Sequence, residues 1–144
     1  QIPISSLELL ARGAGVHPGD AIAVAIDARM SELYFAAYRC TSTDSLECLE
    51  EPRVCPPHEV PASIASITAV GTGWQAYPQA MDGRALRRPE IVQDLDLPNI
   101  AAGLAAAAHG FDRGRGLISA AELEPVYLRN QIALTLEEQR KARS

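Results

Sequence analysis

Residues 21–38 hold two apolar runs separated by one short polar turn, and this pattern restricts the fold more than any other stretch of the chain. Side chains alternate between the two faces of a strand. In the run AIAVAI, isoleucine and valine occupy one face and alanine the other, and the run LYFAAY is equally apolar on both faces. Strands of this kind are typical of α/β proteins, whose sheets are covered on both sides. The sequence therefore predicts a hairpin at the centre of a sheet.

Shorter elements are expected around this hairpin, from capping boxes, proline and glycine positions and apolar spacing. Before and after the hairpin we expect a helix starting at Ser5, and an edge strand with a loop between Arg39 and Pro57. A helix at 61–66, a strand at 67–70 ended by Gly71-Thr72-Gly73, and a helical segment from Trp74 that Pro78 limits to a turn or two follow. The last expected elements are a short strand at Ile91 and Val92, a helix at 99–109 capped by Gly110 and packed tightly on the sheet, and a short helix from Ser119.

Composition narrows the class of protein. The 144 residues suffice for one domain with its own core. A formal net charge of -5 disfavours nucleic-acid binding through a broad basic surface. The chain has no apolar run of about 18 residues, and its start lacks the basic and apolar regions of a secretion signal. We therefore expect a soluble cytoplasmic protein that does not contact a membrane.

Cysteine and histidine are the residue types most able to bind a metal or act in catalysis. Cys40, Cys48, Cys55 and His58 have a spacing that is only loosely like a zinc finger, whereas a structural zinc site needs four converging ligands. An odd number of cysteines without a CxxC pair suits reduced thiols in the cytosol. No serine lies in a GxSxG motif, the nucleophile elbow of α/β-hydrolases, and no histidine has an evident catalytic partner. We expect neither a metal site nor a catalytic nucleophile.

Four motifs occur in a specific order and spacing. They are Ser5-Ser6-Leu7 with Leu10-Ala11, the stretch AIDARMSELYFAAY at 25–38, VGTGW at 70–74 and EPVYLRN at 124–130. Together they resemble the TsaB (YeaZ) family, whose members take part in the threonylcarbamoyl modification of tRNA adenosine. The resemblance covers nearly all of the chain, although the segment between Cys40 and Pro57 matches no family motif.

The resemblance implies a fold and a domain organisation. Residues 1–144 would form the second, C-terminal lobe of a two-lobe actin-like protein (ASKHA, ribonuclease H-like), an α/β lobe with a mixed central sheet flanked by helices. The family's first lobe, with its IDTS-type strand and GPGSFTG-type loop, is absent from this sequence. The chain is thus expected to be a fragment.

The resemblance also implies a function and partners. Members of this family are non-catalytic subunits that bind and activate a related catalytic subunit, TsaD, and a small ATPase, TsaE, also takes part. It implies no cofactor and no metal, only indirect contact with tRNA, and it leaves a homodimer of the full-length protein open. Because the family's main pairing surface lies in the first lobe, the fragment is predicted to be monomeric or only weakly associated with the catalytic partner.

Two roles stay open for the polar turn of the hairpin. Asp27, Arg29 and Glu32 either hold the turn together by ion pairing or shape a contact surface facing the interlobe cleft, and Tyr127 and Arg129 are expected to pack the closing segment. The turn contains no glycine, unlike loops whose amides cradle phosphate.

Two other functions are alternatives to the subunit. One is an actin-like ATPase with a vestigial nucleotide site, in which Gly71 and Gly73 approach adenine and Arg29 approaches phosphate. The other is an inactive homologue of a glycoprotease-like peptidase. Five arginines offer a route to direct tRNA binding, although scattered arginine in an acidic chain usually marks a solvated surface. These are Arg84, Arg87, Arg88, Arg113 and Arg115.

Overall fold

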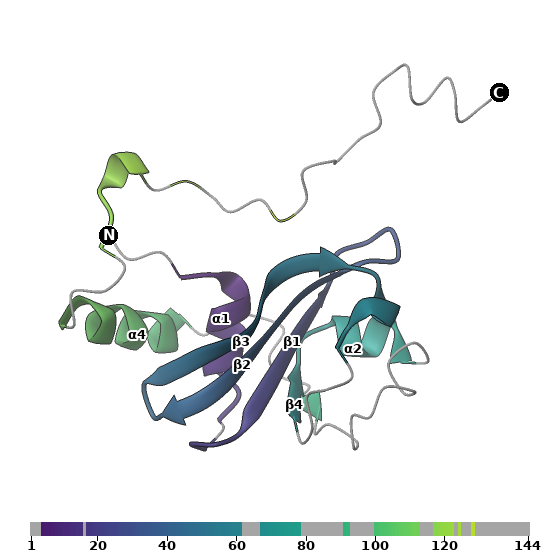
Figure 1. Cartoon of the computed structure of the whole chain (residues 1–144), viewed down its shortest axis with the longest axis horizontal. Coiled ribbons are helices and arrows are strands. Elements are labelled where there is room, and N and C mark those ends of the chain that lie inside the picture. The colour runs from purple at the N-terminus through teal and green to yellow at the C-terminus, as the bar shows by residue number, and fades with distance from the viewer. Residues whose placement is uncertain are drawn as a thin grey trace.

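The fold is a mixed sheet with helices on its faces, seen in a computed structural model (Figure 1). The structure describes residues 4–15, 17–61, 67–78, 91–92, 100–112, 117–122, 124 and 128. Its elements in chain order are α1 (Ser6–Arg12), β1 (Ala21–Asp27), β2 (Leu33–Ser42), β3 (Ser45–Cys55), η1 (Pro57–Glu59), β4 (Ile67–Val70), α2 (Gly73–Ala76), β5 (Ile91–Val92), α4 (Ile100–Asp112) and η2 (Ala120–Glu122). Within this described part, no helix is long and apolar enough to span a bilayer.

The five strands lie in the order β3-β2-β1-β4-β5, which places β1 in the middle. β1 pairs antiparallel with β2, from Ala21 opposite Arg39 to Asp27 opposite Leu33, and pairs parallel with β4 on its other side. β4 in turn pairs parallel with β5. The expected central hairpin and the α/β class are confirmed, because the central strand has a strand on each edge and apolar neighbours on each face.

The alternation along β1 separates two cores. Ile22 and Val24 are fully buried on the face covered by α1. Ala23 and Ala25 point to the opposite face, where they belong to the cluster that contains Trp74. The small alanine side chains on that face leave room for the large indole ring. The alternation of Ile or Val with Ala along β1 therefore reflects the different partners that pack on its two faces.

Trp74 ties α2 to the sheet. Its indole Nε1–H lies 3.1 Å from the carbonyl oxygen of Val70 and 3.3 Å from that of Ala23. A buried indole N–H needs such a partner, and these acceptors belong to β4 and β1. The helical segment from Trp74 is short, as expected, and ends at Ala76, ahead of Pro78.

The stretch between Arg39 and Pro57 contains more strand than expected. β2 runs on to Ser42 and a tight turn leads into the 11-residue β3, which is an edge strand as predicted. The pairing of β2 and β3 has register shifts between Phe35 and Ala37 and again further along. These irregularities interrupt the alternation of side chains between the two faces. For this reason the sequence of this stretch does not alternate between apolar and polar residues as a regular strand would.

Two expectations about α4 are wrong. The helix continues through Gly110 to Asp112, so Gly110 is not its cap. The helix is also not packed tightly on the sheet, because Leu104 is 69% exposed and Phe111 is 65% exposed. The helix packs instead against α1, where an added Cβ at Gly103 would lie 2.4 Å from Leu9. A uniform run of alanine marks no face, so the sequence could not show which side packs.

The remaining expected elements have mixed outcomes. The strand at 67–70 and the short strand at Ile91 and Val92 are confirmed. The capping interaction expected at Ser5 is present, since its hydroxyl accepts the Glu8 backbone N–H at 3.1 Å. At Ser119 the structure has a single 3-10 turn, where the Glu122 carboxylate accepts the Ser119 backbone N–H at 2.9 Å. Residues 62–66 of the expected helix lie outside the described residues.

Candidate functional site

The turn between β1 and β2 has an unusual backbone. Arg29, Met30 and Ser31 all have positive φ, at 64°, 54° and 59°. This left-handed conformation costs an L-residue other than glycine roughly 1–2 kcal/mol, and here it occurs at three consecutive positions. Backbone strain of this kind persists only where the surrounding structure enforces it.

Hydrogen bonds within the turn fix that backbone. The Ala28 N–H donates to the Glu32 carbonyl and the Glu32 N–H donates to the Arg29 carbonyl, each at 3.0 Å. The Asp27 carboxylate accepts the Arg29 backbone N–H at 2.9 Å. Ala28 itself is buried, at 4% exposure. The turn is therefore anchored at its base, and its three left-handed residues are presented outward.

A second segment, 45 residues further along the chain, holds the turn from the side. The Thr72 hydroxyl accepts the Asp27 backbone N–H at 3.1 Å. The Tyr77 hydroxyl donates to the Asp27 carboxylate at 3.2 Å. Desolvation, together with this bond to Asp27, raises the pKa of Tyr77. Asp27 thus links the hairpin turn to the β4–α2 corner.

The two glycines of that corner lie close against β1 and β2. Gly71 has φ of 101°, and an added Cβ would lie 2.4 Å from the Ala25 carbonyl oxygen. At Gly73 an added Cβ would lie 2.6 Å from Leu33 and 3.0 Å from Ala25. The contacts at 2.4 Å and 2.6 Å are shorter than real Cβ contacts, and the one at 3.0 Å is tighter than most of them. Protein atoms occupy the space beside these two glycines.

The surface of this site combines an apolar tip with polar neighbours. Met30 is 76% exposed, and Arg29 and Ser31 beside it are exposed as well. We call Arg29, Met30 and Ser31 the contact tip. An exposed methionine held on an ordered turn can enter an apolar depression in another protein, and a neighbouring guanidinium can bind a carboxylate there.

The structure brings together some of the site residues that the sequence predicted. Asp27, Arg29 and Glu32 lie in one turn, with Gly71 and Gly73 packed behind it. Tyr127 and Arg129 lie outside the described residues, as do the five arginines that offered a route to tRNA binding.

Three further residues of this site were missed in the sequence. Met30 was not singled out, and Thr72 and Tyr77 were not connected to Asp27. No spacing rule joins residues 27, 72 and 77, because the parallel pairing of β1 with β4 brings them together.

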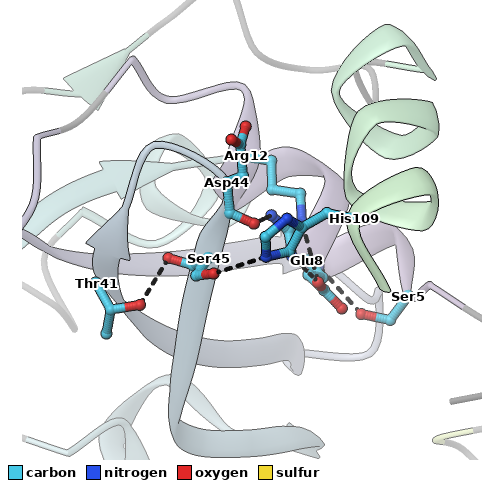
Figure 2. Close-up of polar contacts among 7 residues, drawn as sticks. All are labelled: Ser5, Glu8, Arg12, Thr41, Asp44, Ser45 and His109. Atoms are coloured by element: carbon cyan, nitrogen blue, oxygen red, sulfur yellow. Dashed lines mark hydrogen bonds and ion pairs between the residues drawn. The ribbon is translucent and has the colours of Figure 1, made fainter. Parts of the chain in front are cut away.

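A second cluster of polar residues joins α1, the β2–β3 turn and α4 (Figure 2). The Arg12 guanidinium donates to the Glu8 carboxylate at 2.6 Å and 3.0 Å and to the Asp44 carbonyl at 3.2 Å. On the other side of the turn, the Thr41 hydroxyl donates to the Ser45 carbonyl at 3.1 Å. These bonds fasten the first helix and the tight turn to one another.

Within this cluster, Ser45 and His109 form a serine–histidine contact that the sequence did not reveal. Ser45 Oγ lies 3.5 Å from His109 Nε2, which is long for a hydroxyl hydrogen bond. A catalytic serine needs a close base and a third group that orients the histidine. Among the contacts of the described residues, none supplies that third group. The distance shows that His109 of α4 lies beside the start of β3, and the geometry of the pair does not favour peptide hydrolysis.

The three cysteines lie in different environments. Cys40 and Cys55 are buried and Cys48 is exposed, and all three are free thiols. The Cys40 thiol donates to the Ser42 carbonyl at 3.3 Å, and burial raises the pKa of Cys55. In the residues that the structure describes, no three Cys, His, Asp or Glu side chains converge as metal ligands.

Comparison with known proteins gives two curated relatives. The chain is 34% identical over 142 residues to the tRNA threonylcarbamoyladenosine biosynthesis protein TsaB of Haemophilus influenzae, covering 91% of this chain and 57% of the relative. It is also 34% identical over 139 residues to the protein of the same name in Escherichia coli K12, covering 92% of this chain and 58% of the relative. The chain thus spans less than three fifths of these relatives. No protein-family model matches it.

Solved structures agree with the curated relatives. YeaZ from Pseudomonas aeruginosa matches with a TM-score of 0.70 and 30% identity, over 87% of this chain and 57% of that one. A second structure is described as an uncharacterized protein with similarity to peptidase YeaZ from Pseudomonas aeruginosa. It matches with a TM-score of 0.71 and 33% identity, over 88% of this chain and 57% of that one.

The likeness confirms the expected α/β fold class, of the actin-like kind, because the match extends over most of the chain in both sequence and structure. The four motifs that suggested a family in the sequence therefore identified it correctly. The chain belongs to the TsaB (YeaZ) family and matches a little under three fifths of the length of its relatives.

Proposed function

We propose that this chain acts in the biosynthesis of threonylcarbamoyladenosine in tRNA, as a non-catalytic lobe that helps to bind and activate a TsaD-like catalytic subunit. Two relatives that carry this pathway in their name support the assignment, each at 34% identity. The observation that carries the contact role is the contact tip, a strained and firmly anchored turn with Met30 at its end.

Rigidity is the physical reason to assign binding to this turn. Three left-handed residues cost roughly 1–2 kcal/mol each, and a turn without a functional constraint has no need of them. Because the Asp27 bonds to Arg29 and Tyr77 fix the turn before a partner arrives, little conformational entropy is lost on binding. Methionine and arginine are both enriched at protein interfaces relative to the remaining surface.

The wider assembly follows from the family. We propose that residues 1–144 correspond to the second lobe of a two-lobe protein and that the contact tip faces the cleft between lobes. A TsaE-like ATPase is a further partner, and tRNA is contacted through the assembly rather than by this lobe. Tyr127 and Arg129 are proposed to pack the closing segment.

Nucleotide binding at Gly71, Gly73 and Arg29 is the competing proposal. The two glycines are accounted for by their contacts with Ala25 and Leu33, so their presence adds no support for an adenine site. Calorimetry with ATP separates the proposals: binding that disappears in Arg29→Ala favours a nucleotide site, and no heat of binding favours the subunit role.

A hybrid protein tests the assignment in cells. In this hybrid, the chain replaces the matched segment of the Escherichia coli relative, and it is the sole source of that protein. Nucleosides from total tRNA are then quantified by mass spectrometry. The hybrid is expected to maintain threonylcarbamoyladenosine, and Met30→Glu is expected to reduce it.

The matched control is Met30→Leu, which keeps an apolar tip. A hybrid that is folded and abundant yet makes no modified nucleoside contradicts the pathway assignment. Equal levels in Met30→Glu and Met30→Leu contradict the role of the contact tip.

A further inference from the structure

Tyr77 connects α2 to the turn that carries the contact tip. It follows the last residue of α2, and its backbone N–H donates to the Gly73 carbonyl at 3.2 Å. Its ring is half-buried and packs against the core cluster that contains Trp74. The phenol is thus held both by its backbone and by its ring, and its hydroxyl lies 3.2 Å from the Asp27 carboxylate.

α2 provides a fixed base for this contact, because the β4–α2 corner is tied to the central strand. The Trp74 indole donates to carbonyl oxygens of β1 and β4 at 3.3 Å and 3.1 Å. An added Cβ at Gly71 would lie 2.4 Å from the Ala25 carbonyl oxygen, so the corner and β1 are in close contact. The position of the Tyr77 hydroxyl is therefore set by the core of the sheet.

One oxygen atom of Asp27 serves both the helix and the turn. Asp27 Oδ1 accepts the Arg29 backbone N–H at 2.9 Å and the Tyr77 hydroxyl at 3.2 Å. Arg29 is the first of the three left-handed residues. Desolvation and the bond to Asp27 raise the pKa of Tyr77, whereas the charge of Arg29 lowers it, so both charged residues act on the phenol. The Tyr77 bond restrains the carboxylate from which the strained turn starts.

We propose that Tyr77 is a positioning residue for the contact tip, which it holds through Asp27 in the conformation that a partner protein binds. This inference rests on the proposed function and adds a residue that controls the same site. Left-handed backbone is unfavourable for L-residues, so removing a restraint on Asp27 lets the turn adopt other conformations. The apparent affinity for a partner then falls with the fraction of molecules whose tip is in the binding conformation.

Tyr77→Phe tests the proposal, because it removes the hydroxyl and keeps the ring. Binding of the Escherichia coli TsaD-like subunit to the hybrid protein is measured by isothermal titration, with circular dichroism to verify folding. The affinity is expected to fall about three- to tenfold, as for a tip that is competent about a tenth to a third of the time. The matched control is Tyr34→Phe, which removes a phenol hydroxyl from β2, where the ring packs on the opposite face of the sheet. It is expected to leave the affinity unchanged.

A double-mutant cycle separates positioning from a general effect on stability. Because Tyr77 acts through the contact tip in this proposal, Tyr77→Phe should weaken binding when Met30 is present. It should have little further effect once Met30→Glu has removed the apolar contact, so the two losses are not additive. A hydroxyl with a merely structural role would give the same fold-loss in both backgrounds.

Amide hydrogen exchange measures the same coupling from the other direction. Coupling between two sites is reciprocal, so a partner bound at the contact tip should slow exchange at the end of α2. The amides to follow are those of Ala76 and Tyr77, which donate to the Thr72 and Gly73 carbonyls at 3.1 Å and 3.2 Å. In the Tyr77→Phe protein, the slowing caused by the partner is expected to be smaller.

The outcomes distinguish this inference from the proposed function. If Met30→Glu weakens binding and Tyr77→Phe does not, the positioning role is overturned and the contact tip stands. Additive losses in the cycle, or exchange at the end of α2 that a bound partner leaves unchanged, also overturn the positioning role. If Met30→Glu binds as tightly as the unsubstituted hybrid, the proposed function of the contact tip fails, and the positioning role fails with it.

Discussion

Gly71 and Gly19 form a matched pair for testing how the β4–α2 corner is built. Their φ angles are nearly equal, at 101° and 100°. An added Cβ at Gly71 would lie 2.4 Å from the Ala25 carbonyl oxygen, whereas nothing lies within 4 Å of one at Gly19. Replacing each by alanine therefore changes the backbone preference by a similar amount and creates a steric clash only at position 71.

The expected magnitudes follow from these two contributions. Alanine at a positive φ costs roughly 1–2 kcal/mol of folding free energy at either site. At position 71 the clash forces β1, the central strand of the sheet, to move, and overpacking of this kind costs about 1–3 kcal/mol more. Gly19→Ala is expected to lower the free energy of unfolding by about 1–2 kcal/mol, and Gly71→Ala by about 2–5 kcal/mol.

Urea unfolding followed by circular dichroism measures both values, with fluorescence of Trp74, the chain's one tryptophan, reporting directly on the corner. The denaturant midpoint should fall further for Gly71→Ala at an unchanged slope. Equal losses for the two variants would refute the packing explanation and would leave the space beside Gly71 open to a ligand.

Three further perturbations test other parts of the structure. Thr72→Val removes the acceptor of the Asp27 N–H and is expected to cost about 1 kcal/mol in urea unfolding, with Thr72→Ser close to wild type; a loss in both variants would assign the effect to packing. Burial raises the pKa of Tyr38 to about 12 from 10.0, so the unfolded chain loses its phenolic proton first and the free energy of unfolding should fall between pH 10 and pH 12 by about 1–2 kcal/mol. Tyr38→Phe should show a shallower fall over that range, and identical slopes would contradict this linkage. Arg12→Met removes the guanidinium bonds to Glu8 and to the Asp44 carbonyl. Amide hydrogen exchange at the β2–β3 turn should therefore accelerate. Unchanged exchange would mean that the bonds to Arg12 do not stabilise the turn.

Local sequence patterns predicted those elements whose type is decided by the residues of the element itself. The alternation in AIAVAI and LYFAAY gave the central hairpin, because both faces of those strands are buried. The capping residue Ser5 located α1, and Pro78 limited α2. In each of these cases the deciding signal lies in neighbouring residues of the sequence, although the contacts that bury the two strands come from distant elements.

Other features depend on contacts that no local pattern encodes. The link from Asp27 to Thr72 and Tyr77 arises from the parallel pairing of β1 with β4. The left-handed backbone of Arg29 and Met30 runs against the preference of both residue types, so the sequence indicated a turn there without its conformation. The outward face of α4 was hidden by its alanine content, which looks the same on every side of a helix.

The central claim is that the β1–β2 turn is a preformed contact surface for another protein. Isothermal titration of a TsaD-like catalytic subunit into the purified hybrid protein tests it most directly. The account predicts that Met30→Glu weakens binding about tenfold or more, which corresponds to about 1.4 kcal/mol, while Met30→Leu stays near the unsubstituted value. Identical affinities for all three proteins would contradict the claim.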